Sequence, residues 1–118
     1  MRRAIALLLL TGLACSAKAG EAETEELQIM LQRNNCTACH MIDKRKYGPK
    51  LIEVAEKYAD QKGAEKKLAK KIRAGGTGVW GEDIMPPQPQ VSAADALKIA
   101  KLVLALKSGC TPPSDACK

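Results

Sequence analysis

The sequence predicts a single all-α domain of four to five short helices. Apolar residues recur at helical spacing in four stretches, and no stretch shows the strict alternation of a half-buried strand. The chain has 118 residues, which is enough for one small domain. It holds one tryptophan, two tyrosines and no phenylalanine, so the ring side chains that usually fill a small core are scarce. A large apolar cofactor would supply the missing buried area.

Residues 1–19 are expected to be a secretory signal peptide that is cleaved off. Arg2 and Arg3 form a positively charged start, residues 4–13 are apolar, and Ala17-Lys18-Ala19 offers small residues for cleavage. The apolar run is shorter than the roughly 20 residues that span a membrane, so we expect no stable membrane insertion. An uncleaved anchor is the alternative.

Export would place the chain in an oxidising compartment, the periplasm, with a domain at 20–109 and a tail at 110–118. Lipid anchoring through Cys15 has weak support, because Gly12 stands where a lipoprotein signal has an aliphatic residue. The leader takes three of the 19 basic residues with it, which leaves 16 against 13 acidic ones. These basic residues lack interleaved aromatic side chains, so no nucleic-acid binding is expected.

The first two helices are expected at residues 23–33 and 50–58. Leu27 and Leu31 lie four residues apart with Met30 beside them, and acidic residues at the start suit the positive end of a helix dipole. Pro49 favours the start of the second helix. The inward face predicted for that helix comprises Leu51, Val54, Ala55 and Tyr58.

The last two helices are expected at residues 64–74 and from Ser92 to about Gly109. The Gly75-Gly76 pair should stop the third helix, and Ser92 should cap the fourth. The predicted inward faces comprise Ala64, Leu68 and Ile72, and then Leu97, Ala100, Val103 and Leu104. The loop between these helices, residues 75–90, is long for so small a domain and restricted by prolines, which favours a functional role.

The segment Cys36-Thr37-Ala38-Cys39-His40 has the C-x-x-C-H pattern of covalent attachment of a c-type haem. On the last turn of the first helix, Cys36 and Cys39 would share a face, so that both thiols could add to the vinyl groups of one porphyrin edge. His40 would follow within reach of the iron. It is the only histidine in the sequence, so a second imidazole ligand is excluded.

Other uses of these cysteines fit the sequence less well. A thioredoxin-like C-x-x-C would need a βαβ context, a zinc site would need four ligands, and a disulfide within Cys36-x-x-Cys39 is sterically poor. Only Cys110 and Cys117 could complete a zinc site. In the periplasm these two are expected to form a disulfide that staples the tail, with a free reactive pair as the alternative.

Three methionines are candidates for the second axial ligand of the iron. Met41 adjoins His40 and cannot reach the opposite face of the ring, whereas Met30 lies on the first helix and is expected in the core. Met85 lies in the constrained Ile84-Met85-Pro86-Pro87 segment, where a thioether could face the histidine. Thioether and histidine together fill both axial positions and raise the reduction potential, which favours electron transfer.

Three motifs together resemble the small bacterial class I monohaem cytochromes c, periplasmic carriers that donate electrons to terminal oxidases or haem nitrite reductases. The resemblance covers about Glu26 to Lys107. The motifs are Asn35-Cys36-Thr37-Ala38-Cys39-His40, Tyr47-Gly48-Pro49, and Gly78-Val79-Trp80-Gly81 leading to Met85-Pro86-Pro87. Together they imply the class I cytochrome c fold, in which the helices wrap around one covalently bound haem.

The resemblance also implies roles for single residues. His40 and Met85 would be the axial pair, while Pro49 backs the histidine and a neighbouring carbonyl orients its ring. Trp80 would donate a hydrogen bond to a haem propionate, and Lys71 and Arg73 could also meet propionates. A core tryptophan and a solvated helix face remain the plainer alternatives.

The chain also departs from the family pattern. Ile84 and Gln88 stand where the family usually has proline and asparagine around the axial methionine, which leaves open a hydrogen bond to the Met85 sulfur. An aromatic pair usually joins the first and last helices. The matching positions here are Leu31 and Leu102, so aliphatic packing is expected.

The predicted function is that of a soluble, monomeric one-electron carrier and not an enzyme. The resemblance implies a quinol–cytochrome c reductase as donor and a terminal oxidase or nitrite reductase as acceptor. Basic residues near the pentad could steer an acidic partner, namely Lys44, Arg45, Lys46 and Lys50. The alternatives are a peroxidase-like protein or gas or redox sensor with an open iron site, and a haem-free thiol oxidoreductase.

Overall fold

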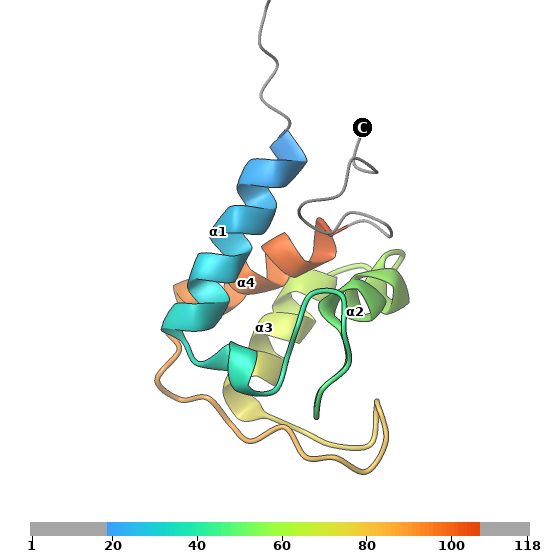
Figure 1. The fold of residues 1–118 in the computed structure, drawn as a ribbon. Coiled ribbons are helices and arrows are strands. Elements are labelled where there is room, and N and C mark those ends of the chain that lie inside the picture. The colour runs from blue at the N-terminus through green and yellow to red at the C-terminus, as the bar shows by residue number, and fades with distance from the viewer. Residues whose placement is uncertain (1–18, 107–118) are drawn as a thin grey trace, which may run out of the picture.

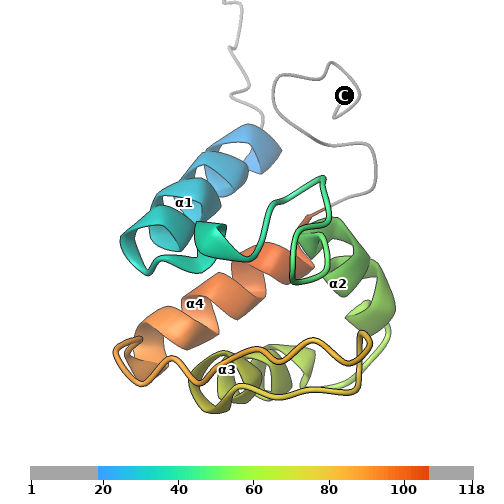
Figure 2. The same cartoon turned by 60° about the horizontal axis from the view of Figure 1, so that its bottom comes forward.

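The C-terminal helix α4 is the element on which the other helices pack. The structure, a computed structural model, describes residues 19–106 and contains α1 (Ala19–Arg33), the 3-10 turn η1 (Cys36–Ala38), α2 (Leu51–Tyr58), α3 (Ala64–Ala74) and α4 (Ala93–Leu104). α4 contacts α1, α2 and α3. Figure 1 shows α1 crossing in front of α4, and Figure 2 shows the segment between α3 and α4 running along one side of this assembly.

The all-α prediction is confirmed, because these 88 described positions hold helices and a single isolated β-bridge but no strand. α2 begins one residue later than predicted, at Leu51, and all four predicted inward residues are buried. α3 spans the predicted residues, with Ala64 and Leu68 buried and Ile72 partly buried.

α1 begins four residues earlier than predicted. Its first turn contains Ala19 and Gly20, and the Thr24 hydroxyl donates to the Gly20 carbonyl at 2.7 Å. Thr24 is buried, so this bond satisfies the hydroxyl within the helix. Leu27, Met30 and Leu31 are buried as expected.

α4 ends earlier than predicted, and its inward face is rotated. Ser92 is the N-cap, with its hydroxyl oxygen accepting from the Asp95 amide at 3.0 Å, but the helix stops at Leu104, short of Gly109. Leu97 and Leu104 are only partly buried. The buried residues are Ala96, Ile99, Ala100 and Val103. Ala100 and Val103 are buried as predicted, whereas Ala96 and Ile99 take the inward places predicted for Leu97 and Leu104.

The predictions for the leader and the tail lie outside the described residues, including Cys15 and the Cys110–Cys117 disulfide. Within residues 19–106, no helix is both long and apolar enough to cross a membrane.

Replacement of Leu27 by alanine tests whether the contact between α1 and α4 stabilises the fold. Leu27 is fully buried, so we expect the free energy of unfolding to fall by about 2–4 kcal/mol in denaturant titrations. Ile29→Ala is the matched control on the same helix, because Ile29 is 50% exposed. Equal losses for the two variants would contradict the packing of α1.

Candidate haem site

The C-x-x-C-H pentad begins on η1, which is separate from α1; Cys39 caps this 3-10 turn and His40 follows it. Asn35 adopts φ 59° and ψ 21°, a left-handed conformation that redirects the chain after α1 ends. The expectation that the pentad continues the first helix is therefore wrong. Cys36 and Cys39 are nevertheless expected to share one face, because residues three apart lie above one another on a 3-10 helix. Cys36 and Cys39 both line one cavity.

His40 is oriented by the loop that follows it. Its Nδ1 lies 3.0 Å from the carbonyl oxygen of Pro49, a buried residue. A carbonyl can only accept a hydrogen bond, so Nδ1 carries the proton and the Nε2 lone pair is left for a metal. The carbonyl expected beside Pro49 is that of Pro49 itself.

Gly48 gives the imidazole its space. A Cβ atom at this position would lie 2.7 Å from Nδ1 of His40, and Cε1 would be nearer still. The Gly48 amide also donates to the Cys39 carbonyl at 3.0 Å, which closes the loop against the pentad. A side chain here would displace the ring.

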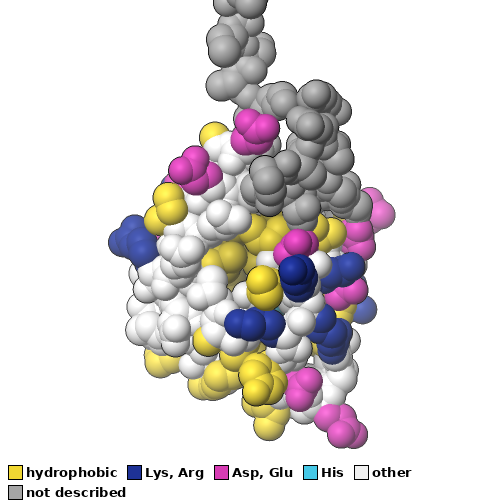
Figure 3. Space-filling model, in the orientation of Figure 1, with side chains coloured by type: hydrophobic (Ala, Val, Ile, Leu, Met, Phe, Trp, Pro, Cys, Tyr) yellow, Lys and Arg dark blue, Asp and Glu magenta, His cyan; other side chains and the backbone are white. Residues whose placement is uncertain are grey.

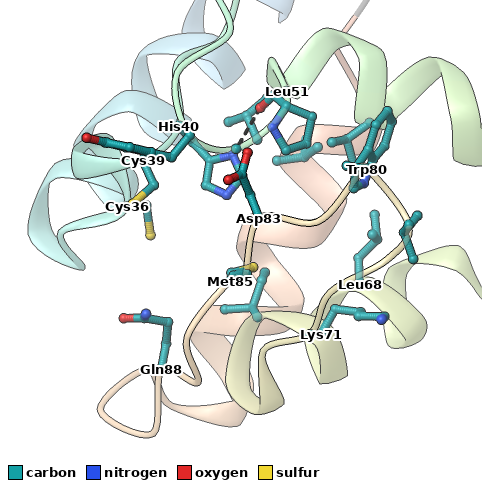
Figure 4. A pocket seen from close by; sticks show the side chains of 18 of the residues that line it. Cys36, Cys39, His40, Leu51, Leu68, Lys71, Trp80, Asp83, Met85 and Gln88 are labelled. Carbon is teal, nitrogen blue, oxygen red and sulfur yellow. Dashed lines mark hydrogen bonds between the residues drawn. The ribbon is translucent and has the colours of Figure 1, made fainter.

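A cavity separates the pentad from the segment at residues 76–88 (Figure 4). It contains about 1340 Å³ of space free of protein atoms, its open mouth included. Its inner wall is largely aliphatic and comes from α1, α2, α3 and α4. The wall includes Leu31, Leu51, Val54, Leu68, Ile99 and Val103.

Met85 lies across this cavity from His40 (Figure 4). Its amide donates to the Gly76 carbonyl at 2.8 Å, and its carbonyl accepts from the Gly76 amide at 2.9 Å. Gly75, at φ 71°, approaches so closely that a Cβ atom would lie 2.8 Å from the Pro87 nitrogen. The antiparallel bridge between Gly76 and Met85, together with the rigid Pro86-Pro87 pair, therefore fixes the backbone of Met85.

Sequence reasoning missed the part played by Gly75 and Gly76 in this bridge. It explains the pair only as the stop of α3, and the second of two adjacent glycines is the signal that could have indicated a close backbone approach. A β-bridge of a single residue pair has no periodic sequence pattern by which it could be predicted.

Of the residues expected near propionates, two line the cavity and one does not. Trp80 and Lys71 are lining residues. Arg73 points elsewhere, with its Nε donating to the Val91 carbonyl at 3.1 Å. The structure therefore brings Trp80 and Lys71, but not Arg73, to the cavity.

Gln88 lines the cavity without a recorded bond to Met85. Its Nε2 donates to the Pro86 carbonyl at 3.1 Å, and its Oε1 accepts from Gln90 Nε2 at 2.7 Å. The side chain is thus used within its own loop.

Burial raises the pKa of the Cys36 thiol, and the neighbouring Cys39 adds to this effect. Thiol oxidoreductases need the opposite, since the thiolate is their nucleophile. The electrostatics therefore disfavour redox chemistry by the free thiols.

Comparison with known proteins identifies the family. The sequence pattern of the family described as Cytochrome c matches residues 28–107. The chain belongs to the cytochrome c family. The predicted cytochrome c fold and family are thereby confirmed.

Two relatives illustrate how much of the cytochrome is shared. Cytochrome c-552 of Nitrosomonas europaea is 46% identical over 78 residues, which are 66% of this chain and 76% of that protein. Cytochrome c-551 of Pseudomonas aeruginosa is 41% identical over 104 residues, 88% of this chain and 96% of its own. The crystal structure of the wild-type Nitrosomonas protein superposes with a TM-score of 0.67 and 45% identity, over 68% of this chain and 99% of the other.

As a small class I monohaem cytochrome, the protein is an electron carrier and not an enzyme. It carries one covalently bound haem c with its iron and exchanges electrons with redox partners. The cavity fits this group, because two thiols, a correctly protonated imidazole and a thioether converge on a space with aliphatic walls.

Gly48→Ala tests the space beside His40. The added methyl group would press on the imidazole, so we expect less haem-loaded protein and an altered absorption spectrum of the fraction that forms. Gly20→Ala is the control, because no atom lies within 4 Å of the added Cβ. A normal yield and spectrum for Gly48→Ala would contradict this account of the ring.

Proposed function

We propose that the protein is a periplasmic one-electron carrier whose haem is attached through Cys36 and Cys39 and ligated by His40 and Met85. The observation that carries this proposal is the placement of Met85 across the cavity from His40, with its backbone fixed on both sides by Gly76. The haem, when bound, supplies one-electron exchange between ferrous and ferric iron.

The residues around the cavity have distinct tasks in this proposal. The Pro49 carbonyl keeps the His40 ring in one tautomer and orientation, and the Gly76 bridge keeps the Met85 thioether opposite. Two axial protein ligands leave no open position for a substrate or a gas, which favours the carrier over an enzyme or sensor. Trp80 and Lys71 would supply N–H donors to the propionates.

The remaining parts of the proposal concern the ends of the chain. Residues 1–19 would direct export and be removed, which leaves the cytochrome domain at 20–109 in the periplasm. There Cys110 and Cys117 would form the disulfide of the tail. The charged and apolar start of the leader and the oxidising compartment support these assignments.

Redox partners would dock at the mouth of the cavity. Three exposed apolar residues line it, with exposed fractions of 73% for Tyr47, 74% for Ile84 and 41% for Val79. Figure 3 shows hydrophobic side chains gathered on the lower edge of this face, with Lys and Arg side chains above them and Asp and Glu side chains at the lower right. An apolar contact with cations along its upper side suits an acidic redox protein. We propose a quinol–cytochrome c reductase as donor and a terminal oxidase or nitrite reductase as acceptor.

Met85→Ala tests the axial ligand. We expect the thioether-to-iron charge-transfer band to disappear, the reduction potential to fall and carbon monoxide to bind the reduced protein readily, because one axial position opens. Met41→Ala is the control, since Met41 is a half-exposed neighbour of His40. An unchanged spectrum of Met85→Ala, or ready carbon monoxide binding by the wild type, would favour an open-site protein instead.

Ile84→Ser tests the docking surface. The minority of interface side chains that dominate binding cost more than about 1 kcal/mol on truncation. The most exposed apolar side chain at the mouth is expected among them, so electron transfer to a purified nitrite reductase or terminal oxidase should slow about fivefold. Ile29→Ser is matched to it, because Ile29 is an exposed isoleucine on α1. Equal rates for the two variants with both acceptors would place the docking surface elsewhere.

A further inference from the structure

Arg45 lies in a loop that is closely tied to the haem-attachment pentad. The Gly48 amide donates to the Cys39 carbonyl at 3.0 Å, and the Lys46 amide donates to the Gly48 carbonyl at 3.3 Å. The Lys46 ammonium donates to the Thr37 carbonyl at 3.0 Å. These bonds on both sides of Arg45 hold its backbone beside the His40 wall of the cavity.

The opposite wall includes an excursion of the chain, residues 77–84, whose two ends meet at the Gly76–Met85 bridge. A turn at its tip is closed by the Gly78 amide, which donates to the Gly81 carbonyl at 3.0 Å. The tip residues are exposed apart from Trp80, so little packing holds them. Movement of this excursion would act directly on the bridge that positions Met85.

Arg45 joins the two walls. Its Nη2 donates to the Trp80 carbonyl at 3.0 Å, a contact between residues 35 positions apart. Lys57 of α2 lies over the Trp80 ring, with its Nζ 5.2 Å from the centroid. Trp80 is therefore held through its backbone by one cation and through its ring by another, both from the half of the chain that carries His40.

We propose that Arg45 is a positioning residue that fastens the 77–84 excursion over the cavity and thereby keeps Met85 on the iron. A guanidinium bound to a carbonyl is a charge-assisted contact, stronger than a bond between neutral groups. Opening of the excursion must break it, so the open population is smaller while the contact exists. The role is additional to any steering of partners by the charge of Arg45, and it rests on the proposed ligation by Met85.

The test compares three variants of the haem-loaded protein: Arg45→Ala, Arg45→Lys and Lys44→Ala. Lys44 is the neighbouring exposed cation, so its removal makes the same change in charge without removing a recorded bond to Trp80. Lysine at position 45 keeps the charge but lacks the planar fork of the guanidinium. Both positions are exposed, and a thermal melt checks that each of the three variants is folded.

The first measurement is the rate at which added imidazole displaces Met85 from the oxidised protein, followed through loss of the thioether-to-iron band. We expect Arg45→Ala to react about three- to tenfold faster than the wild type, because a charged hydrogen bond no longer opposes opening. Arg45→Lys should be intermediate and Lys44→Ala unchanged. Equal rates for Arg45→Ala and Lys44→Ala would overturn the proposal.

The second measurement is amide hydrogen exchange. Exchange should accelerate in residues 77–84 of Arg45→Ala and stay constant in α1 and α4. Unchanged exchange in the excursion would also overturn the role of Arg45. A wild type without the thioether band would instead refute ligation by Met85, so the two proposals fail on different observations.

Discussion

The hydrophobic core and the wall of the haem cavity share a set of apolar side chains, and the rest of the structure depends on this sharing. Eight residues belong to both: Leu31, Leu51, Val54, Tyr58, Leu68, Ile99, Ala100 and Val103. The helices therefore pack on one another and on the cofactor at once. This explains how a chain with so few aromatic residues builds a core, since the porphyrin contributes the flat apolar surface that those residues would otherwise provide.

Helices build the back of the cavity, whereas loops present His40 and Met85. The His40 ring depends on Pro49 and Gly48, and Met85 depends on Gly76. Backbone groups at Pro49 and Gly76 make these hydrogen bonds, so the loops are held at the positions where His40 and Met85 stand. This arrangement suits the proposed carrier, in which the two side chains would stay in place in both oxidation states while the mouth remains accessible to partners.

The sequence predicted the parts that periodicity and motif govern. α3 has the expected bounds and α2 nearly so, because charged residues and turn signals flank their apolar stripes. The pairing of His40 and Met85 across one cavity was also foreseen, through the pentad and the constrained Met85-Pro86-Pro87 segment. The path of the chain at the pentad was not, since the left-handed turn at Asn35 leaves no periodic signal.

The direction of single side chains was harder to predict from the sequence, as Arg73 and the inward face of α4 show. The family resemblance gave Arg73 the same task as Lys71, yet a helix turns about 100° per residue and the two side chains diverge. On α4, Leu97 was predicted to face inward and Ala96 was not, but Ala96 is the fully buried one of the two. Close helix approach is a tertiary property, and a single sequence gives little warning of it.

The hydrogen bond between His40 and Pro49 spans only nine positions along the chain, whereas Met85 stands 45 positions beyond His40. Closing the longer loop costs more entropy, so on warming the methionine side is released first. In the proposed ligation, His40 would stay with the iron because attachment of the haem through Cys36 and Cys39 tethers it there. The absorption spectrum of the haem should therefore change at a lower temperature than the helix content, so the haem reports the first loss of native structure.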